Sequence, residues 1–142
     1  GHKVLIERAL ADPDVHAVPL TTEEEGVALA AGAHLGDRRA VLLMQSSGTG
    51  NCINMLSLVR HGRFPFLTFV TMRGDFGEGN PWQMPMGGAV ESVLAAMGVI
   101  VRRVDTPDLV VPTAEAALTM AFRAGGAVAV LLGQRLIGAK SF

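Results

Sequence analysis

Three features are scarce in this 142-residue chain: cysteine, an excess of charge of one sign, and long apolar runs. The single cysteine excludes an intrachain disulfide and a cysteine-based zinc site, so a reducing cytoplasm is the expected compartment. A formal net charge of -1 without a basic run argues against nucleic acid and anionic membranes as partners. Gly, Pro or a charged residue interrupts each apolar stretch before about 18 residues, so no membrane span is expected.

Metal-binding and targeting patterns are also missing. His2, His16, His34 and His61 form neither an H-x-x-x-H nor an H-E-x-x-H pattern, so each is expected at the surface or in packing, and no metal site is predicted within the chain. No signal peptide is visible. The chain enters a helical pattern directly after Gly1, which is compatible with a cloning remnant or with a missing native N-terminus.

Helical and strand patterns alternate along the whole chain. With 49% hydrophobic residues, residues 1–142 fit one domain with a sizeable core. Apolar runs of strand length alternate with helical patterns, which predicts an α/β fold with a parallel sheet and helices on both faces. Helices are expected from Val4 to an end at Asp12-Pro13 and at 22–35, 51–61, 88–97 and 113–123, and strands at 15–20, 40–45, 66–72, 99–104 and 127–132.

Residues 21–51 combine an acid-headed helix, a buried strand and a glycine-rich segment. Thr22 and Glu25 have the spacing of a capping box, and small residues from Gly26 onward leave a helix that neighbours can approach closely. Glu23, at the start of this helix, could aim its carboxylate at a ligand. All three acids, Glu23 to Glu25, could equally be solvated groups that interact with the helix dipole.

A polar turn is expected at residues 46–50, between strand and helix, where open α/β sheets bind ligands. It lacks the lysine of a P-loop and the third glycine of the dinucleotide fingerprint, which makes a phosphate cradle a weak prediction beside a simple tight turn. Ser46 and Ser47 do not fit the G-x-S-x-G nucleophile elbow. Cys52 is expected in the core because its helix neighbours are apolar.

Residues 73–87 form the one long connection, rich in Gly, Pro and Met. Arg73 directly follows a buried strand, where its guanidinium could bind an anionic substrate or pair with an acid of the loop. Asp75 and Glu78 do not have the spacing of a calcium loop, so a solvated, flexible segment is expected there.

These segments together resemble the pyrimidine-binding domain of thiamine-diphosphate-dependent decarboxylases, most closely the alpha subunits of sulfopyruvate decarboxylases and the related phosphonopyruvate decarboxylases. The resemblance covers nearly the whole chain. It rests on TEEEGV followed by AAG, on MQSSGTGN, on Arg73-Gly74 and on QMPMG, which occupy residues 22–32, 44–51, 73–74 and 83–87. Thr49 stands where the family more often has leucine, and residues 60–63 depart from the family pattern.

The resemblance implies roles for individual residues. Glu23 corresponds to the glutamate that activates the cofactor by hydrogen bonding to its pyrimidine ring, while Glu24 and Glu25 do not carry that role. The other cofactor-binding residues would be Gln45, Ser46, Ser47, Gly48 and Asn51. Gln45, Arg73 and Gln83 would contact an anionic 2-oxo acid, which loses carbon dioxide to give an aldehyde.

The resemblance also implies a partner. Thiamine diphosphate and its Mg²⁺ are held between this type of domain and a pyrophosphate domain, whose Gly-Asp-Gly motif Gly74-Asp75-Phe76 does not match. We therefore expect a hetero-oligomer with a pyrophosphate-domain (beta) subunit, or a chain from which that domain was removed, and a first strand that lies upstream of Gly1. Exposed apolar surface is expected around Met44, Met84, Met86 and the small-residue helix.

Two other functions are compatible with the sequence. One is a non-catalytic regulatory or assembly subunit of the same fold, for which Glu23 would be dispensable. The other is a small doubly wound nucleotide-binding module, which would bind a nucleotide without a second chain.

Overall fold

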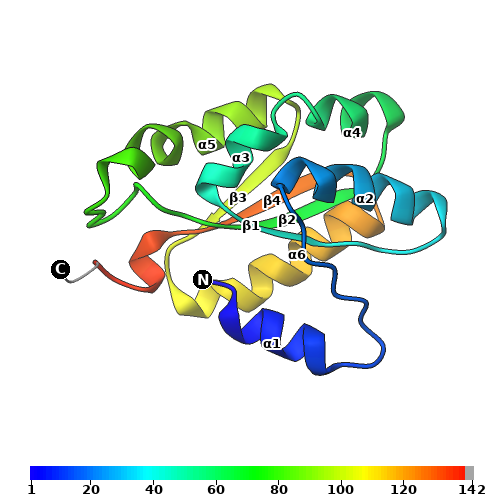
Figure 1. Cartoon of the computed structure of the whole chain (residues 1–142), viewed down its shortest axis with the longest axis horizontal. Coiled ribbons are helices and arrows are strands. Elements are labelled where there is room, and N and C mark those ends of the chain that lie inside the picture. Colours follow the sequence, from blue (N-terminus) through cyan, green and yellow to red (C-terminus); the bar gives the residue numbers. More distant parts are fainter. Residues whose placement is uncertain (140–142) are drawn as a thin grey trace.

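A four-stranded parallel sheet forms the centre of the computed structural model, which describes residues 1–139 (Figure 1). The strand order is β1-β2-β4-β3. Gln45, Thr71, Leu132 and Val104 lie in register across the sheet, so all four strands end at one edge, here called the carboxyl edge. The strands are β1 (Leu42–Gln45), β2 (Phe66–Thr71), β3 (Ile100–Val104) and β4 (Ala127–Leu132).

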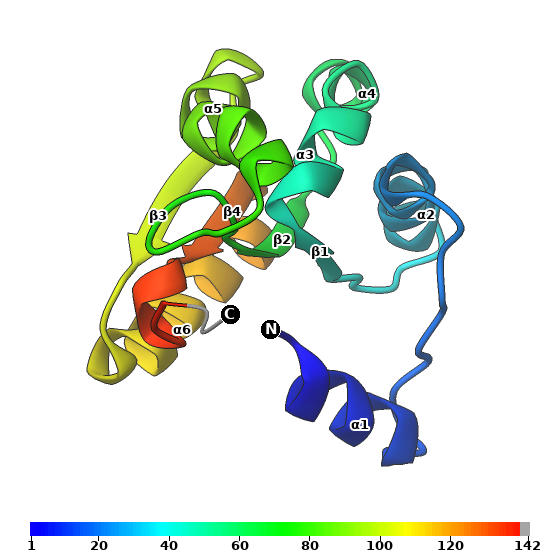
Figure 2. The same cartoon turned by 60° about the vertical axis from the view of Figure 1, so that its left-hand side comes forward.

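Helices cover both faces of this sheet, as the sequence predicts (Figure 2). Four helices pack on one face and α6 packs alone on the other. The helices and 3-10 turns are α1 (Lys3–Ala11), α2 (Glu23–Leu35), α3 (Ser46–Cys52), α4 (Leu56–Gly62), η1 (Pro81–Gln83), α5 (Met84–Ala96), η2 (Pro107–Leu109), α6 (Val110–Phe122) and η3 (Gln134–Leu136).

Each face of the sheet has its own hydrophobic core. Strand β2 is apolar apart from its threonines because its side chains alternate between the two cores. Phe66 and Val70 enter the core beneath α2 to α5, and Leu67 enters the core beneath α6. Met44 is buried in the larger core, so the expectation that it contributes exposed apolar surface is wrong. Gly26 lets α2 lie close to β1, since an added Cβ would be 2.4 Å from Leu42 Cδ1.

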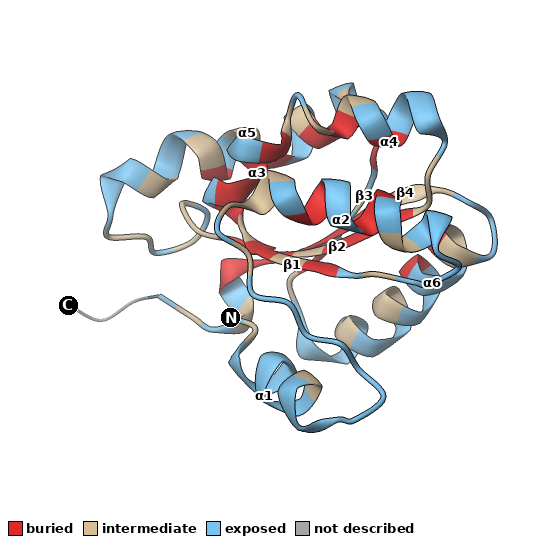
Figure 3. Ribbon diagram, turned by 45° about the vertical axis from the view of Figure 1, so that its right-hand side comes forward, coloured by how far each residue is buried: buried red, intermediate tan, exposed pale blue. Residues whose placement is uncertain are grey.

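The expected strand at residues 15–20 does not form. The segment is extended but pairs with no strand of the sheet, and Pro19 has no N–H for a strand ladder. Helix α1 has no buried residue and lies apart from the sheet (Figure 3). His2 connects it to the sheet, because its Nε2 is 3.2 Å from Met44 O and 3.1 Å from Phe69 O. Burial lowers the pKa of His2.

Several helix boundaries also differ from expectation. The helix expected at 51–61 is two helices, α3 and α4, separated by a turn at residues 53–55. Helices α5 and α6 begin about one turn early, at Met84 and Val110, because Pro85 and Pro112 lie in their first turns, where no intrahelical N–H bond is lost. The long connection therefore shortens to residues 73–80. None of the helices described in residues 1–139 has the length and hydropathy to cross a bilayer.

Candidate active site at the carboxyl edge

Glu23, the first residue of α2, lies directly against α3. A Cβ added to Gly48 would be 2.4 Å from Glu23 Cγ and 2.5 Å from Glu23 Oε1, so only glycine leaves room for the carboxylate here. Asn51, one turn further along α3, donates a hydrogen bond from Nδ2 to Glu23 Oε2 at 2.7 Å. The structure thus brings Glu23 together with two residues 25 and 28 positions later in the sequence and fixes one oxygen of its carboxylate.

The two following glutamates lie in different surroundings. Glu25 accepts a hydrogen bond from the Thr21 amide at 2.9 Å, so it satisfies a main-chain donor before the helix. Thr22 makes no side-chain cap bond, and the predicted reciprocal capping box is therefore wrong. The Thr22 hydroxyl instead lowers the pKa of Glu24. Glu23 is the acid of this turn that contacts α3 through a side-chain hydrogen bond.

The expected glycine-rich turn is a helix. Helix α3 begins at Ser46, directly after β1, so residues 46–50 do not form a phosphate-binding loop. Ser46 is fully buried: its Oγ accepts a hydrogen bond from the Arg73 amide at 3.0 Å and is 3.3 Å from the Arg73 carbonyl. This hydroxyl ties the end of β1 to the end of β2.

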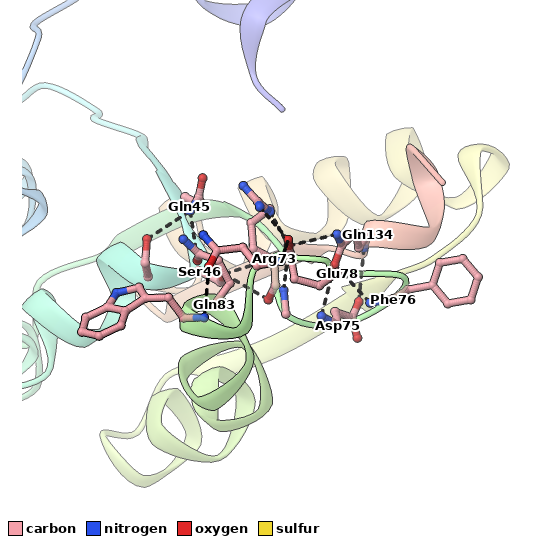
Figure 4. A network of polar contacts seen from close by, with 12 residues as sticks. Gln45, Ser46, Arg73, Asp75, Phe76, Glu78, Gln83 and Gln134 are labelled. Carbon is pink, nitrogen blue, oxygen red and sulfur yellow. Dashed lines mark hydrogen bonds and ion pairs between the residues drawn. The ribbon is translucent and has the colours of Figure 1, made fainter. Parts of the chain in front are cut away.

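Gln45, Ser47 and Gln83 form a second polar group at this edge. Gln45 Nε2 is 3.1 Å from Ser47 Oγ and 3.3 Å from Gln83 Oε1, so one amide bridges the end of β1 and the turn η1. Figure 4 shows Gln45 and Gln83 side by side, with Arg73 next to them. The residues predicted to contact substrate therefore lie along one stretch of the carboxyl edge.

Arg73 is held by an acid of its own loop. Its Nε and Nη2 donate to the Glu78 carboxylate at 2.5 and 2.7 Å. The Glu78 side chain is only 2% exposed and also accepts from the amides of Gly74 and Asn80. Hydrogen bonds from Arg73 hold the pKa of Glu78 far below its usual range. The alternative of a structural ion pair for Arg73 is confirmed, and its Nη1 is not used by this pair.

Gln134 is a residue that sequence reasoning missed. It is fully buried; its Oε1 accepts from the amides of Asp75 and Phe76 at 3.1 Å, and its Nε2 donates to Glu78 at 3.2 Å. The prediction of a freely solvated loop is therefore wrong, since the segment is bonded to the end of β4 (Figure 4). The sequence does contain a signal for Gln134, because it is a polar residue just after a buried strand and lies at the same sheet edge as Gln45.

The other candidate residues, Asp75 and Cys52, are engaged in an ion pair and in the core. Asp75 pairs with Arg103 and accepts from the Gln134 amide, and no group of three metal-binding side chains occurs among the residues that the structure describes. Cys52 is a buried core residue, as expected, and burial followed by the charges of Glu23 and Glu24 raises its thiol pKa to about 12.

Comparison with known proteins identifies relatives among the sulfopyruvate and phosphonopyruvate decarboxylases. No protein-family model matches the chain. It is 37% identical to the sulfopyruvate decarboxylase subunit alpha of Methanothermobacter thermautotrophicus over 131 residues, which are 92% of this chain and 79% of that protein. The subunit alpha of Methanococcus maripaludis is 41% identical over 98 residues, which are 68% of this chain and 59% of that protein.

A phosphonopyruvate decarboxylase of Streptomyces viridochromogenes is 38% identical over 87 residues, 61% of this chain and 22% of that protein. The chain spans less than two thirds of the length of two alpha subunits. It covers 59% of the one from Methanococcus maripaludis and 63% of the one from Methanocaldococcus jannaschii. The match of 92% of the chain at 37% identity nonetheless shows its family. The chain belongs to the family of sulfopyruvate decarboxylase alpha subunits.

Proposed function

We propose that this chain is the pyrimidine-binding part of a thiamine-diphosphate-dependent decarboxylase that acts on an anionic 2-oxo acid. The substrate would resemble sulfopyruvate or phosphonopyruvate, the compounds in the names of the relatives, and the products would be carbon dioxide and an aldehyde. The observation that carries this proposal is the Glu23 carboxylate, held by Asn51 in a space that Gly48 leaves open.

The residues around Glu23 fit the pyrimidine ring of the cofactor. Glu23 Oε2 is engaged by Asn51, and a carboxylate oxygen is the acceptor that a protonated ring nitrogen requires. The amide of Gln45 and the hydroxyl of Ser47 add both donors and acceptors to the same edge. Thiamine diphosphate, when bound, supplies a nucleophilic carbon and an electron sink for loss of carbon dioxide.

In this proposal, the chain's own residues bind and orient. Glu23 accepts a hydrogen bond from the ring nitrogen and stabilises the proton there, while Asn51 fixes the carboxylate and Gly48 keeps it from being displaced. Arg73 donates from Nη1 to the anionic group of the substrate while Glu78 holds the other side of its guanidinium. Gln83 and Gln45 orient the substrate beside it.

The partner in this proposal is a pyrophosphate-domain subunit that holds the diphosphate and Mg²⁺. Three of the relatives carry the name subunit alpha, which supports a multi-subunit enzyme. We place the assembly in a reducing cytoplasm, a proposal that rests on the scarcity of cysteine in the chain. The nucleotide-binding alternative is disfavoured, since residues 46–50 are helical and do not form a loop around a phosphate.

The test is Glu23→Gln in the assembled enzyme. Glutamine keeps the side-chain size and an oxygen for Asn51 but removes the negative charge, so turnover should fall by about a hundred- to ten-thousandfold. Glu25→Gln is the matched control from the same helical turn and should leave turnover nearly unchanged. Glu24 is a poorer control because one of its carboxylate oxygens is buried. Equal turnover of the Glu23→Gln variant and the parent would refute the proposal.

A further inference from the structure

A cavity of about 330 Å³ opens at the edge of the sheet where the strands begin, at the far end from Gln45 and Arg73. Figure 1 shows α4, which forms one side of it, at the opposite end of the sheet from η3. Apart from glycines and two arginines, the residues that line it have apolar side chains. The lining residues are Leu56, Val59, Arg60, Arg63, Phe64, Met97, Gly98, Val99, Gly125 and Ala127.

Two arginines are among the residues that line this cavity, and neither has a countercharge there. Arg60 and Arg63 are three residues apart at the end of α4, and no acid is among the lining residues. Within residues 1–139, neither arginine has an ion-pair partner. The Arg60 side chain lies along Gly98, whose added Cβ would be 3.5 Å from Arg60 Nη1. A volume of this size with two unpaired guanidinium groups suits a small anion.

The backbone conformation at Arg63 ends α4 and is one that glycine adopts more readily than arginine. Arg63 follows α4 in the left-handed conformation, with φ of 55°, at a position where glycine is the common residue. This conformation lets the Arg63 and Phe64 amides both donate to Val59 O, which ends the helix. An arginine at this position therefore costs stability that a glycine would not, and Arg63 is one of the residues that line the cavity.

We propose that this cavity binds a small organic anion. A carboxylate, sulfonate or phosphate group would lie between Arg60 and Arg63, and the apolar part of the ligand would contact Phe64 and Met97. The glycines at positions 98 and 125, both with positive φ, form walls without side chains. The site is separate from the carboxyl edge and does not depend on the function proposed for Glu23.

Phenyl phosphate is a suitable probe because it combines a dianion with an apolar ring. We expect saturable shifts of the Gly98 and Gly125 amides in proton–nitrogen NMR spectra of the full chain at constant ionic strength. Inorganic phosphate should bind more weakly, and benzyl alcohol, which has no charge, should not shift these amides. Shifts that do not saturate, or that benzyl alcohol reproduces, would overturn the proposal.

Arginine variants separate this site from general surface charge. Arg60→Gln should weaken phenyl phosphate binding at least about tenfold, as expected for loss of a charge-assisted hydrogen bond. Arg123→Gln is the control, since Arg123 ends the neighbouring α6 but does not line the cavity. Equal weakening by both substitutions would indicate a nonspecific charge effect and contradict the site.

Arg63→Gly distinguishes a binding role from a structural one. Glycine relieves the positive φ, so the melting temperature should rise by about 3 °C while phenyl phosphate binding falls at least about tenfold. If binding is unchanged in this variant, Arg63 contributes nothing to a ligand and the proposal fails. Because the variant is expected to fold more stably than the parent, loss of binding cannot be attributed to unfolding.

Discussion

At the scale of single residues, the candidate site depends on what is absent at Gly48. A methyl group there would overlap Glu23 Cγ, Cδ and Oε1, all within 2.5 Å. The half-buried Glu23 side chain would have to leave this rotamer, and with it the hydrogen bond from Asn51, to make room for the methyl group. The position of the Glu23 carboxylate is thus encoded by a glycine 25 positions later, together with the amide of Asn51.

Gly48→Ala should therefore destabilise the chain by about 1–3 kcal/mol through overpacking against Glu23, although alanine is the better helix former. In a Glu23→Ala background the clash disappears, and the same substitution should be neutral or stabilising. Urea unfolding of the four proteins of this cycle measures the coupling. Gly32→Ala is the control within α2, because an added Cβ there meets nothing within 4 Å. Additive effects of Gly48→Ala and Glu23→Ala would show that the contact is absent.

Cys52 should be unreactive in the folded chain. With its pKa raised to about 12 by burial and nearby acids, only about one thiol in ten thousand is ionised at pH 8. Alkylation by iodoacetamide, followed by mass spectrometry, should be orders of magnitude slower than in guanidinium-unfolded chain. Similar rates in the two states would mean that the thiol is accessible and that the core around α3 is loosely packed.

At the scale of elements, residues 73–80 are ordered by side chains that come from elsewhere in the sequence. Glu78 accepts hydrogen bonds from Arg73 and from two loop amides, and Gln134, just beyond β4, donates a further hydrogen bond to Glu78. Buried polar groups stabilise only when all their partners are present, so the loop and the sheet edge are coupled. Glu78 also determines how much of the Arg73 guanidinium remains for a substrate.

The pH dependence of stability tests this pairing. The folded-state pKa of Glu78 is depressed, so its contribution is present above the unfolded value of about 4.5 and is lost as the pH falls toward the folded value. Glu78→Gln should melt at a lower temperature than the parent at pH 7, and the difference should shrink below about pH 4.5. A difference that stays constant from pH 7 to pH 3 would contradict the ion pair. Glu91→Gln, at an exposed position of α5, is the control and should melt like the parent.

The elements also show what could be predicted from the sequence and what could not. The apolar runs in β2 and β4 predict buried parallel strands because their residues face two cores, and this prediction is confirmed. Residues 15–20 have the same local pattern but no neighbouring strand to pair with, which a local pattern cannot reveal. Ser46, where α3 begins, is hydrogen-bonded to Arg73, 27 positions away, a contact that the local pattern does not reveal either.

At the scale of the whole molecule, apolar side chains are exposed next to the candidate site. Trp82 is 84% exposed and Met84 is 47% exposed, and both flank Gln83. A separate group of exposed apolar side chains lies on α1, across the sheet from α5 (Figure 2): Val4, Leu5, Ile6 and Leu10. Large exposed apolar side chains in one region are typical of surfaces that another chain covers.

Trp82 is the only tryptophan of the chain and therefore reports on this surface directly. The isolated chain should show the fluorescence of a solvated indole, and the emission should move to shorter wavelength when a partner covers η1. Sedimentation should also show self-association of the chain without its partner, reduced in a Trp82→Ser variant. A monodisperse monomer at high concentration, with Trp82 emission unchanged by the partner, would contradict an interface at this surface.

Carbon dioxide release from sulfopyruvate tests the central claim most directly. The chain would be combined with its co-purified pyrophosphate-domain partner, thiamine diphosphate and Mg²⁺, and compared with each chain alone and with a mixture that contains Glu23→Gln. The account predicts release from the parent mixture only, with the Glu23→Gln mixture slower by about a hundred- to ten-thousandfold. Release by the partner alone at the rate of the mixture, or an undiminished rate with Glu23→Gln, would contradict it.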